Sequence, residues 1–230
     1  CALPILETTE GPVLVLAGAG TGKTRVITYR VAHLIQQGVP GSAILAVTFT
    51  NKAAGVMKER IADLLRSTGD DASGVLVSTF HSFCARLLRR EATHLGLARD
   101  FAIYDDDAQS AAVKRSLAAA NFSAEDYSPR SVRAQISHAK NHGITPETME
   151  SDGALMQDAN RQDLAKIFRA YETILRKCSA LDFDDLLLQA VVLLRDHPQV
   201  RAAWNARFQY ILVDEFQDTN AAQEELVRLL

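Results

Sequence analysis

Residues 12–24, "PVLVLAGAGTGKT", join an apolar run to a glycine-rich turn and decide the fold class. The run itself, residues 12–18, is short, rich in Val and Leu, and ends in glycine, so it predicts a buried strand. "KTRVITYRVAHLIQQG" (23–38) follows, with apolar residues at helical spacing and Gly38 as a stop signal. A strand, a tight turn and a helix in this order are typical of α/β proteins.

The alternation continues downstream of this unit. "AILAVTF" (43–49) and "GVLVSTF" (74–80) predict two further buried strands. "NKAAGVMKERIADLL" (51–65) and "HSFCARLLRREATHL" (81–95) predict the helices that follow them. Strands and helices that alternate in this way predict a parallel sheet with right-handed crossovers.

After Asp105 the pattern becomes helical, and no credible strand interrupts it until "YILVD" at 210–214. An insertion of this length is too long for a structureless loop, so we expect an all-helical subdomain inside the α/β domain. The four segments that predict its helices are residues 105–120, 128–142, 160–180 and 182–194.

Composition narrows the class of protein. Of the 230 residues, 47% are hydrophobic and 23% are charged, which is typical of a globular protein. The net charge of −3 predicts no general attraction to nucleic acid, so a nucleic-acid contact would need local positive charge. No apolar run reaches the ~18 residues of a membrane span. Three widely spaced cysteines fit neither a disulfide framework nor a zinc site and predict a cytoplasmic protein.

"AGAGTGKT" (17–24) lies after the first predicted strand and opens a helix, as a Walker A phosphate loop does, although Ala17 replaces the usual first glycine. Its glycines let backbone N–H groups turn toward phosphate oxygens, Lys23 can reach the β- and γ-phosphates, and Thr24 can ligate Mg²⁺. The alternative is a glycine-rich turn with an exposed lysine. The expected nucleotide contacts are Ala17, Gly18, Ala19, Gly20, Thr21, Gly22, Lys23, Thr24 and Arg25.

"YILVDEFQDTN" (210–220) predicts the matching Walker B strand. Asp214 would hold Mg²⁺ together with Thr24, and Glu215 would orient and deprotonate the attacking water. An acidic cap on an ordinary strand is the alternative interpretation. A second carboxylate directly after the first favours an ATPase over a small-molecule kinase.

Five segments together resemble, in order and spacing, the UvrD/PcrA/Rep helicases of superfamily 1. Residues 17–25 resemble their motif I, 46–61 motif Ia, 78–90 motif Ib, 181–187 a segment that precedes motif II, and 214–220 motif II. The resemblance implies an α/β fold with a RecA-like P-loop NTPase parallel sheet and an all-helical insertion. The first lobe would comprise residues 1–104 and 196–230, and a DNA-binding subdomain would comprise residues 105–195.

The resemblance also implies an activity, that of an ATP-dependent 3′–5′ DNA helicase using ATP and Mg²⁺. Its catalytic residues would be Lys23, Asp214, Glu215 and Gln217, with Gln217 sensing the γ-phosphate. Partners would be single-stranded DNA, duplex junctions, a second motor lobe, and accessory repair or replication proteins, with no membrane. The start at Cys1 and the end within a predicted helix indicate a fragment, which we expect to be nearly inactive without the second lobe.

A path for single-stranded DNA is implied along motifs Ia and Ib. Its expected residues are Phe49, Thr50, Asn51, Thr79, Phe80 and His81. Phe49 can stack on a base while hydroxyls and amides hold phosphates. For Phe80 and Phe83, a place in the core is the open alternative. The glutamine motif that reads adenine in this family is absent from residues 1–16, so adenine recognition stays unassigned.

Two other functions stay open: a RecB-type helicase–nuclease, and a P-loop switch that binds nucleotide without unwinding. Asp182, Asp184 and Asp185 are compatible with a two-metal nuclease, but a helix cap is the favoured interpretation. Two further expectations concern the helices. The basic group Arg130, Arg133 and Lys140 predicts either a phosphate contact or a solvated helix face. The cysteines Cys84 and Cys178 are both expected in the core.

Overall fold

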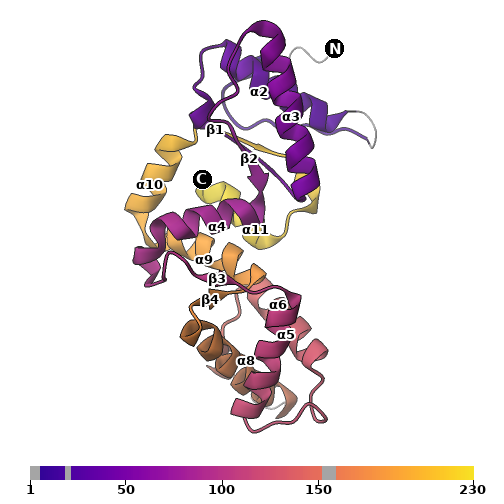
Figure 1. The fold of residues 1–230 in the computed structure, drawn as a ribbon, viewed down its shortest axis with the longest axis vertical. Helices are drawn as coiled ribbons and strands as arrows, with labels where there is room; N and C mark the ends of the chain where they lie inside the picture. The colour runs from indigo at the N-terminus through magenta and orange to yellow at the C-terminus, as the bar shows by residue number, and fades with distance from the viewer. Residues whose placement is uncertain (1–5, 19–21, 152–158) are drawn as a thin grey trace. The chain divides into compact units, whose positions relative to one another are not determined.

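The structure is a computed structural model that describes residues 6–18, 22–151 and 159–230. The chain divides into two compact units. The first contains residues 1–83, 198–219 and Leu230, and the second contains residues 84–197 and 220–229. Figure 1 follows the chain through both units. Among the described residues, no helix is both long enough and apolar enough to span a bilayer.

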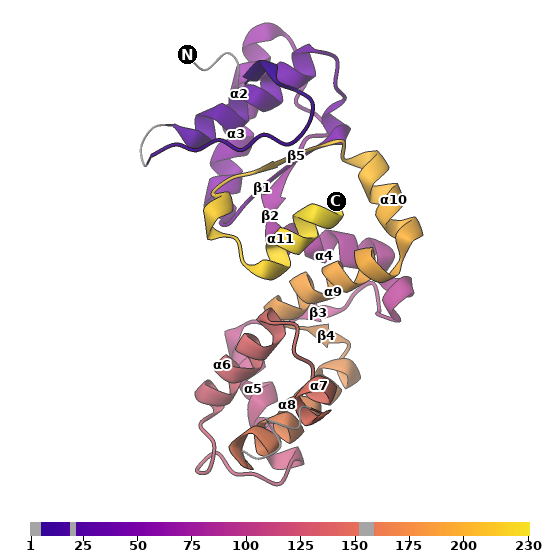
Figure 2. The ribbon, with the colours of Figure 1, turned by 180° about the vertical axis from the view of Figure 1, so that it is seen from behind.

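A three-stranded parallel sheet lies in the first unit. Its order is β2-β1-β5, with β1 (Ile44–Thr48) between β2 (Leu76–Thr79) and β5 (Tyr210–Val213). All five residues of β1 are buried, as expected for the central strand of a covered sheet. Ala46 pairs with Val77 on one side and with Leu212 on the other, so a late segment of the chain lies directly beside an early one (Figure 2). The three corresponding strand predictions are confirmed.

Two helices, α2 (Lys23–Gln36) and α3 (Asn51–Thr68), pack on each other and bury apolar faces with this sheet. Helix α3 begins where the Thr50 hydroxyl accepts a hydrogen bond from the Ala53 N–H over 3.1 Å, a side-chain N-cap. Helix α2 ends at Gln36, and Gly38 follows its C-cap residue with a φ of +89°, which suits glycine, so the predicted stop signal is confirmed. Shorter elements of this unit are η1 (Gly41–Ala43), α10 (Pro198–Arg207) and η4 (Phe216–Asp218).

Residues 12–18 correct one prediction, because they form no strand and lie outside the sheet. Leu14 and Leu16 are 70% and 86% exposed. A segment becomes a strand only when a neighbour pairs with its backbone, and apolar composition does not specify that neighbour. Here β2 and β5 occupy both sides of β1. The prediction that residues 12–18 form a buried strand is therefore wrong for this structure, whereas the predicted Walker B strand is present as β5.

The second unit is mainly helical. Helix α4 (Phe80–Glu91) begins in the first unit and continues into the second. The other elements of the second unit are η2 (Ala92–Leu95), β3 (Ala102–Ile103), α5 (Asp106–Ala119), α6 (Pro129–Asn141), α7 (Pro146–Ser151), α8 (Ala159–Lys177), β4 (Ala180–Leu181), α9 (Phe183–Asp196) and α11 (Ala221–Leu229). Residues of α5, α6 and α8 form its core, in which Tyr171 and Phe168 are the largest side chains.

One detail of the helical region differs from the prediction, because β3 and β4 pair as a short parallel ladder. Ser179 has a φ of +46° and ends the preceding helical segment. The chain is then extended, and the Ser179 carbonyl accepts a hydrogen bond from the Ala102 N–H over 2.9 Å. A two-residue strand carries no periodicity, so the sequence could not reveal it.

Candidate active site

The N-terminus of α2 forms one side of the candidate site. Gly22 precedes the helix with a φ of +91°, a backbone conformation that residues other than glycine rarely adopt. Lys23 and Thr24 open the helix and are half-buried, while Ala17, Gly18 and Arg25 are exposed. The remaining residues of the expected phosphate loop, Ala19, Gly20 and Thr21, lie outside the described residues.

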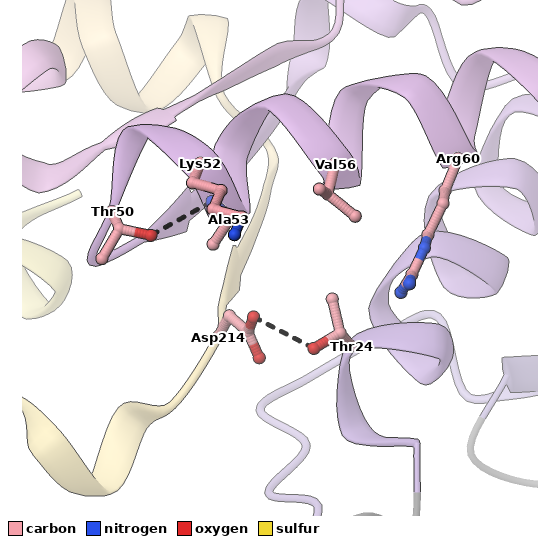
Figure 3. A pocket seen from close by; sticks show the side chains of 7 residues that line it. All are labelled: Thr24, Thr50, Lys52, Ala53, Val56, Arg60 and Asp214. Atoms are coloured by element: carbon pink, nitrogen blue, oxygen red, sulfur yellow. Dashed lines mark hydrogen bonds between the residues drawn. The ribbon is translucent and has the colours of Figure 1, made fainter.

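The end of β5 forms the other side. The Asp214 N–H donates to the Val47 carbonyl over 2.9 Å, which extends the ladder by one residue and fixes the carboxylate at the strand end. The Thr24 hydroxyl donates to Asp214 Oδ2 over 3.3 Å, as Figure 3 shows. The fold therefore brings together the two residues that the sequence predicts to share a metal ion.

The surroundings of the Asp214 carboxylate favour binding of a cation. Its side chain is buried, and Oδ1 has no hydrogen-bond partner. Burial, and after it the adjacent charge of Glu215, raises the pKa of Asp214 above its usual value. A bound cation would reverse both effects, because it would neutralise the buried carboxylate and occupy the free oxygen.

The donor set fits Mg²⁺ better than a metal held by protein ligands alone. Mg²⁺ is commonly bound through one or two protein oxygens, with phosphate oxygens and waters completing the octahedron. Thr24 and Asp214 supply one hydroxyl and one carboxylate. Within the described ranges, no group of three or more His, Cys, Asp or Glu residues is placed to hold a metal ion.

A second pair of charges lies beside the first. Lys23 Nζ is 3.1 Å from Glu215 Oε2, and the side-chain amide of Gln217 donates to the same oxygen. These contacts lower the pKa of Glu215, the Gln217 hydrogen bond more than Lys23. Glu215 also has a φ of +52°, which is uncommon for a residue other than glycine. Three of the predicted catalytic side chains are therefore in direct contact.

Next to Thr24 and Asp214 lies a cavity of about 280 Å³ (Figure 3). The α3 residues Lys52, Val56 and Arg60 line it, and sequence reasoning did not select them. Their spacing of four is a signal that could have found them, since residues i, i+4 and i+8 share one face of a helix. The residues around the cavity are Thr24, Thr50, Lys52, Ala53, Val56, Arg60 and Asp214.

The structure separates the expected DNA-path residues into exposed and buried groups. Thr50 and Asn51 are exposed at the start of α3, and Phe49 and His81 are half-buried. Thr79 is buried and its hydroxyl caps α4 by accepting from the Ser82 N–H over 3.2 Å. Two further aromatic residues, Phe80 and Phe83, lie near this path.

Phe80 is only 2% exposed and packs on Phe49 with ring centroids 5.6 Å apart. Phe83 is buried against Trp204, with centroids 5.7 Å apart. Burial therefore favours a place in the core for both Phe80 and Phe83. Phe49, by contrast, is only half-buried.

The acidic group at the start of α9 serves as a helix cap. Asp182 and Asp185 form a reciprocal capping box, and both are buried. Lys140 Nζ lies 2.8 Å from Asp182 Oδ2, 2.6 Å from Asp185 Oδ1 and 2.8 Å from Glu172 Oε1. The cap interpretation is confirmed for Asp182. Lys140 belongs neither to a solvated face nor to a phosphate contact, and both interpretations are wrong for it.

The other members of these groups differ in their surroundings. Arg133 pairs with Asp106, with 3.2 Å between Nη1 and Oδ1, while Arg130 is exposed. Cys84 is buried as predicted. Cys178 is exposed, which corrects the prediction: it follows the last residue of α8 and lies 3.5 Å from Arg115.

The parallel sheet, the positive-φ Gly22 that precedes α2 and the two carboxylates that follow β5 define, with the family match, a RecA-like P-loop NTPase domain with a helical insertion. The chain belongs to the UvrD/REP helicase N-terminal domain family, whose model matches residues 3–230. The resemblance inferred from the five motifs is thereby confirmed.

Similar proteins include the ATP-dependent DNA helicase PcrA of Leuconostoc citreum, which is 44% identical over 98% of this chain. The PcrA proteins of Staphylococcus aureus (strain Mu50) and Staphylococcus epidermidis are 43% and 42% identical, again over 98% of this chain. The chain spans 30% of the length of each of these relatives.

Proposed function

We propose that this chain is the first motor lobe of an ATP-dependent DNA helicase that moves 3′–5′ along single-stranded DNA. The observation that carries the proposal is the arrangement of two contacts in one site, Thr24 with Asp214 and Lys23 with Glu215. The relatives named as DNA helicases support the choice of DNA as the polymer.

In the proposed reaction, Lys23 and the backbone at the start of α2 bind the phosphates of ATP, because a helix N-terminus and a lysine both favour negative charge. Thr24 and Asp214 would hold Mg²⁺ by the hydroxyl and the carboxylate that already face each other. Mg²⁺ held by these two residues would offset the negative charge that develops on the phosphates during hydrolysis. Lys52 and Arg60 add positive charge along the same cavity.

Glu215 is the proposed general base. Its carboxylate contacts Lys23 and Gln217. A γ-phosphate that draws Lys23 away would remove a cation from Glu215 and so raise its pKa. A base whose pKa is closer to neutral accepts a proton from water more effectively. Substrate binding would therefore activate Glu215, while Gln217 senses the same phosphate.

DNA would be held by exposed groups at the start of α3 together with the half-buried Phe49. Phe49 would stack on a base, and Thr50 and Asn51 would bind phosphates. Phe80 supports the Phe49 ring from the core, which is a less direct role than the one expected for it.

The proposal also covers the domain boundaries, the partners and the cellular location. We assign residues 1–104 and 196–230 to the motor lobe and residues 105–195 to the DNA-binding insertion. A second motor lobe would close the ATP site, and duplex junctions and accessory repair or replication proteins would be further partners. Cytoplasmic location is proposed from the few, widely spaced cysteines.

The test is steady-state ATP hydrolysis by the full-length protein, with and without single-stranded DNA, followed by unwinding of duplexes with 3′ or 5′ tails. A helicase of this kind requires hydrolysis that DNA stimulates strongly, and unwinding from the 3′ tail. Nucleotide binding that ignores DNA, with no unwinding of either substrate, would favour a nucleotide-dependent switch instead.

A further inference from the structure

The first turn of α3 lies beside the end of β5, where the proposed metal ligand Asp214 is placed. The Asp214 N–H donates to the Val47 carbonyl over 2.9 Å, so Asp214 continues the ladder next to the end of β1. A short connection then leads from β1, which ends at Thr48, to Thr50, the N-cap of α3. All of these residues belong to the first compact unit. The sheet therefore fixes the start of α3 near the Asp214 carboxylate.

Lys52 is the cation of this first turn. It lines the cavity of about 280 Å³ together with Thr24 and Asp214, as Figure 3 shows. Arg60 lines the same cavity eight residues later, which is about 12 Å further along the helix axis. Lys52 is therefore the basic residue of α3 at the end of the cavity where Asp214 lies, and Arg60 belongs to the other end.

The Lys52 ammonium is available for a ligand. It is exposed, and within the part of the chain that the structure describes it takes part in no hydrogen bond or ion pair. A lysine is also unfavourable in the first turn of a helix, because the N-terminal end of the helix dipole is positive. The first turn of α3 contains no acidic residue that would offset this charge. The stability of the helix therefore does not explain Lys52, whereas an anion in the cavity would.

The rest of the cavity indicates which anion this is. Thr24 lies in the first turn of α2 beside Lys23, where the phosphates of ATP are proposed to bind. The Thr24 hydroxyl donates to Asp214 Oδ2 over 3.3 Å, so the proposed metal ligands are in contact with each other. Lys52 lines the cavity that both of them line. A phosphate chain that is bound at the start of α2 and extends into this cavity can therefore be contacted from α3 as well.

We infer that Lys52 is a phosphate-binding residue of the ATP site, whose ammonium donates to a phosphate oxygen from α3 while Lys23 does so from α2. The inference rests on the proposed use of this cavity for ATP, but it requires neither DNA nor the helical unit. A DNA phosphate is the other anion to consider, because Thr50 and Asn51 are proposed DNA contacts. ATP is favoured because Lys52 shares its cavity with the proposed metal ligands.

The experiment measures binding of a fluorescent, non-hydrolysable ATP analogue with Mg²⁺ to the full-length protein. Lys52→Ala should raise the Kd about tenfold, as expected for loss of one hydrogen bond to a charged group in an open site. Lys52→Arg should keep most of the affinity, because a guanidinium also binds phosphate. Lys58→Ala is the matched control and should leave the Kd unchanged, since Lys58 is an exposed lysine of the same helix that does not line the cavity.

Two further measurements test other roles for Lys52. The Tm of Lys52→Ala should not fall, because the substitution removes an unfavourable charge from the first turn of α3. The affinity of this variant for single-stranded DNA without nucleotide should also be unchanged. Weaker DNA binding with unchanged ATP binding would overturn the inference in favour of a DNA phosphate contact. A lower Tm with loss of both affinities would overturn it in favour of a structural role.

The result for Lys52 is distinguishable from the result for the proposed function. Weaker ATP binding by Lys52→Ala, in a protein whose hydrolysis ignores DNA and which unwinds no duplex, would support the inference and contradict the helicase. DNA-stimulated hydrolysis and unwinding, together with an ATP affinity that Lys52→Ala leaves unchanged, would support the helicase and overturn the role of Lys52.

Discussion

The hydroxyl of Thr24 donates to the carboxylate of Asp214 across 190 positions of sequence. Two placements produce this contact: α2 begins at Lys23, and β5 ends at Val213 beside the central strand. The chain between them returns to the same sheet after forming the helical unit. The distance in sequence between the two Walker motifs is therefore compatible with a single site.

Lys23→Ala should remove ATP hydrolysis, with a fall of about 10²–10³-fold or more, because the variant loses the cation that opens α2, where the phosphates are proposed to bind. Thermal stability should hardly change, since the Lys23–Glu215 pair is partly exposed and such pairs contribute about 0–1 kcal/mol. Lys58→Ala, an exposed lysine of α3, is the matched control. Equal loss of activity in both variants would contradict a specific role for Lys23.

Phe49→Ala should weaken the response to single-stranded DNA more than it weakens ATP binding. A base stacked on an aromatic side chain contributes about 1–3 kcal/mol, so the DNA concentration that half-saturates ATP hydrolysis should rise accordingly. Phe49→Trp keeps an aromatic face and should retain most of the response. A DNA titration in which the alanine variant behaves as the unsubstituted protein would exclude stacking by Phe49.

Lys140→Met should destabilise the helical unit by about 3–5 kcal/mol, the usual consequence of leaving buried carboxylates without their cation. Lys140 is 3% exposed and lies between Asp182 and Asp185. Urea unfolding measures the change, with the exposed Lys114→Met as control, which should stay within about 0.5 kcal/mol of the unsubstituted protein. If both substitutions have equal effects, the buried network contributes no specific stability.

The same network predicts a pH dependence. Burial, with the charges of Asp182 and Glu172 as further causes, outweighs Lys140 and raises the pKa of Asp185 from 3.8 to about 8. Between these values the folded chain keeps a proton that the unfolded chain has released, so the free energy of unfolding falls as pH rises. Asp185 therefore costs the folded state least below pH 3.8, where it is protonated in both states. It lowers the free energy of unfolding most above about pH 8, where the folded chain must also ionise it.

Asp185→Asn removes this titration. The free energy of unfolding of the variant, relative to the unsubstituted protein, should therefore rise steadily across the same pH range. Urea unfolding at several pH values gives the comparison. Parallel pH profiles for the two proteins would show that Asp185 is ionised in the folded chain.

Much of the fold could be predicted because periodicity reports burial. The five apolar residues of β1 and the apolar face of α3 have patterns that only one kind of element satisfies. Residues 12–18 have the same strand-like pattern but lie outside the sheet, because pairing depends on neighbours far away in sequence. Short elements such as β4 carry no pattern at all.

The features of the second unit and of the site also divide into those that the sequence predicts and those that it does not. Thr24, Lys23, Asp214 and Glu215 could be predicted because phosphate and metal chemistry demands those residue types in a local motif. Two features depend on tertiary contacts alone: the burial of Lys140 between carboxylates, and the bond from Asn220 to Asn141. A lysine on an amphipathic helix is usually exposed to solvent. The sequence pattern therefore predicts an exposed Lys140, whereas the structure buries it.

Glu215→Gln tests the central claim most directly, because it changes one oxygen of the proposed base. The variant should bind ATP at least as well as the unsubstituted protein, since Lys23 is released from its ion pair, while DNA-stimulated hydrolysis should fall about 10²–10⁴-fold. Nucleotide binding and single-turnover hydrolysis, measured side by side on the full-length protein, separate the two effects. Retained binding with stalled hydrolysis is the predicted result, and rapid turnover by the variant would contradict the assignment of Glu215 as the base.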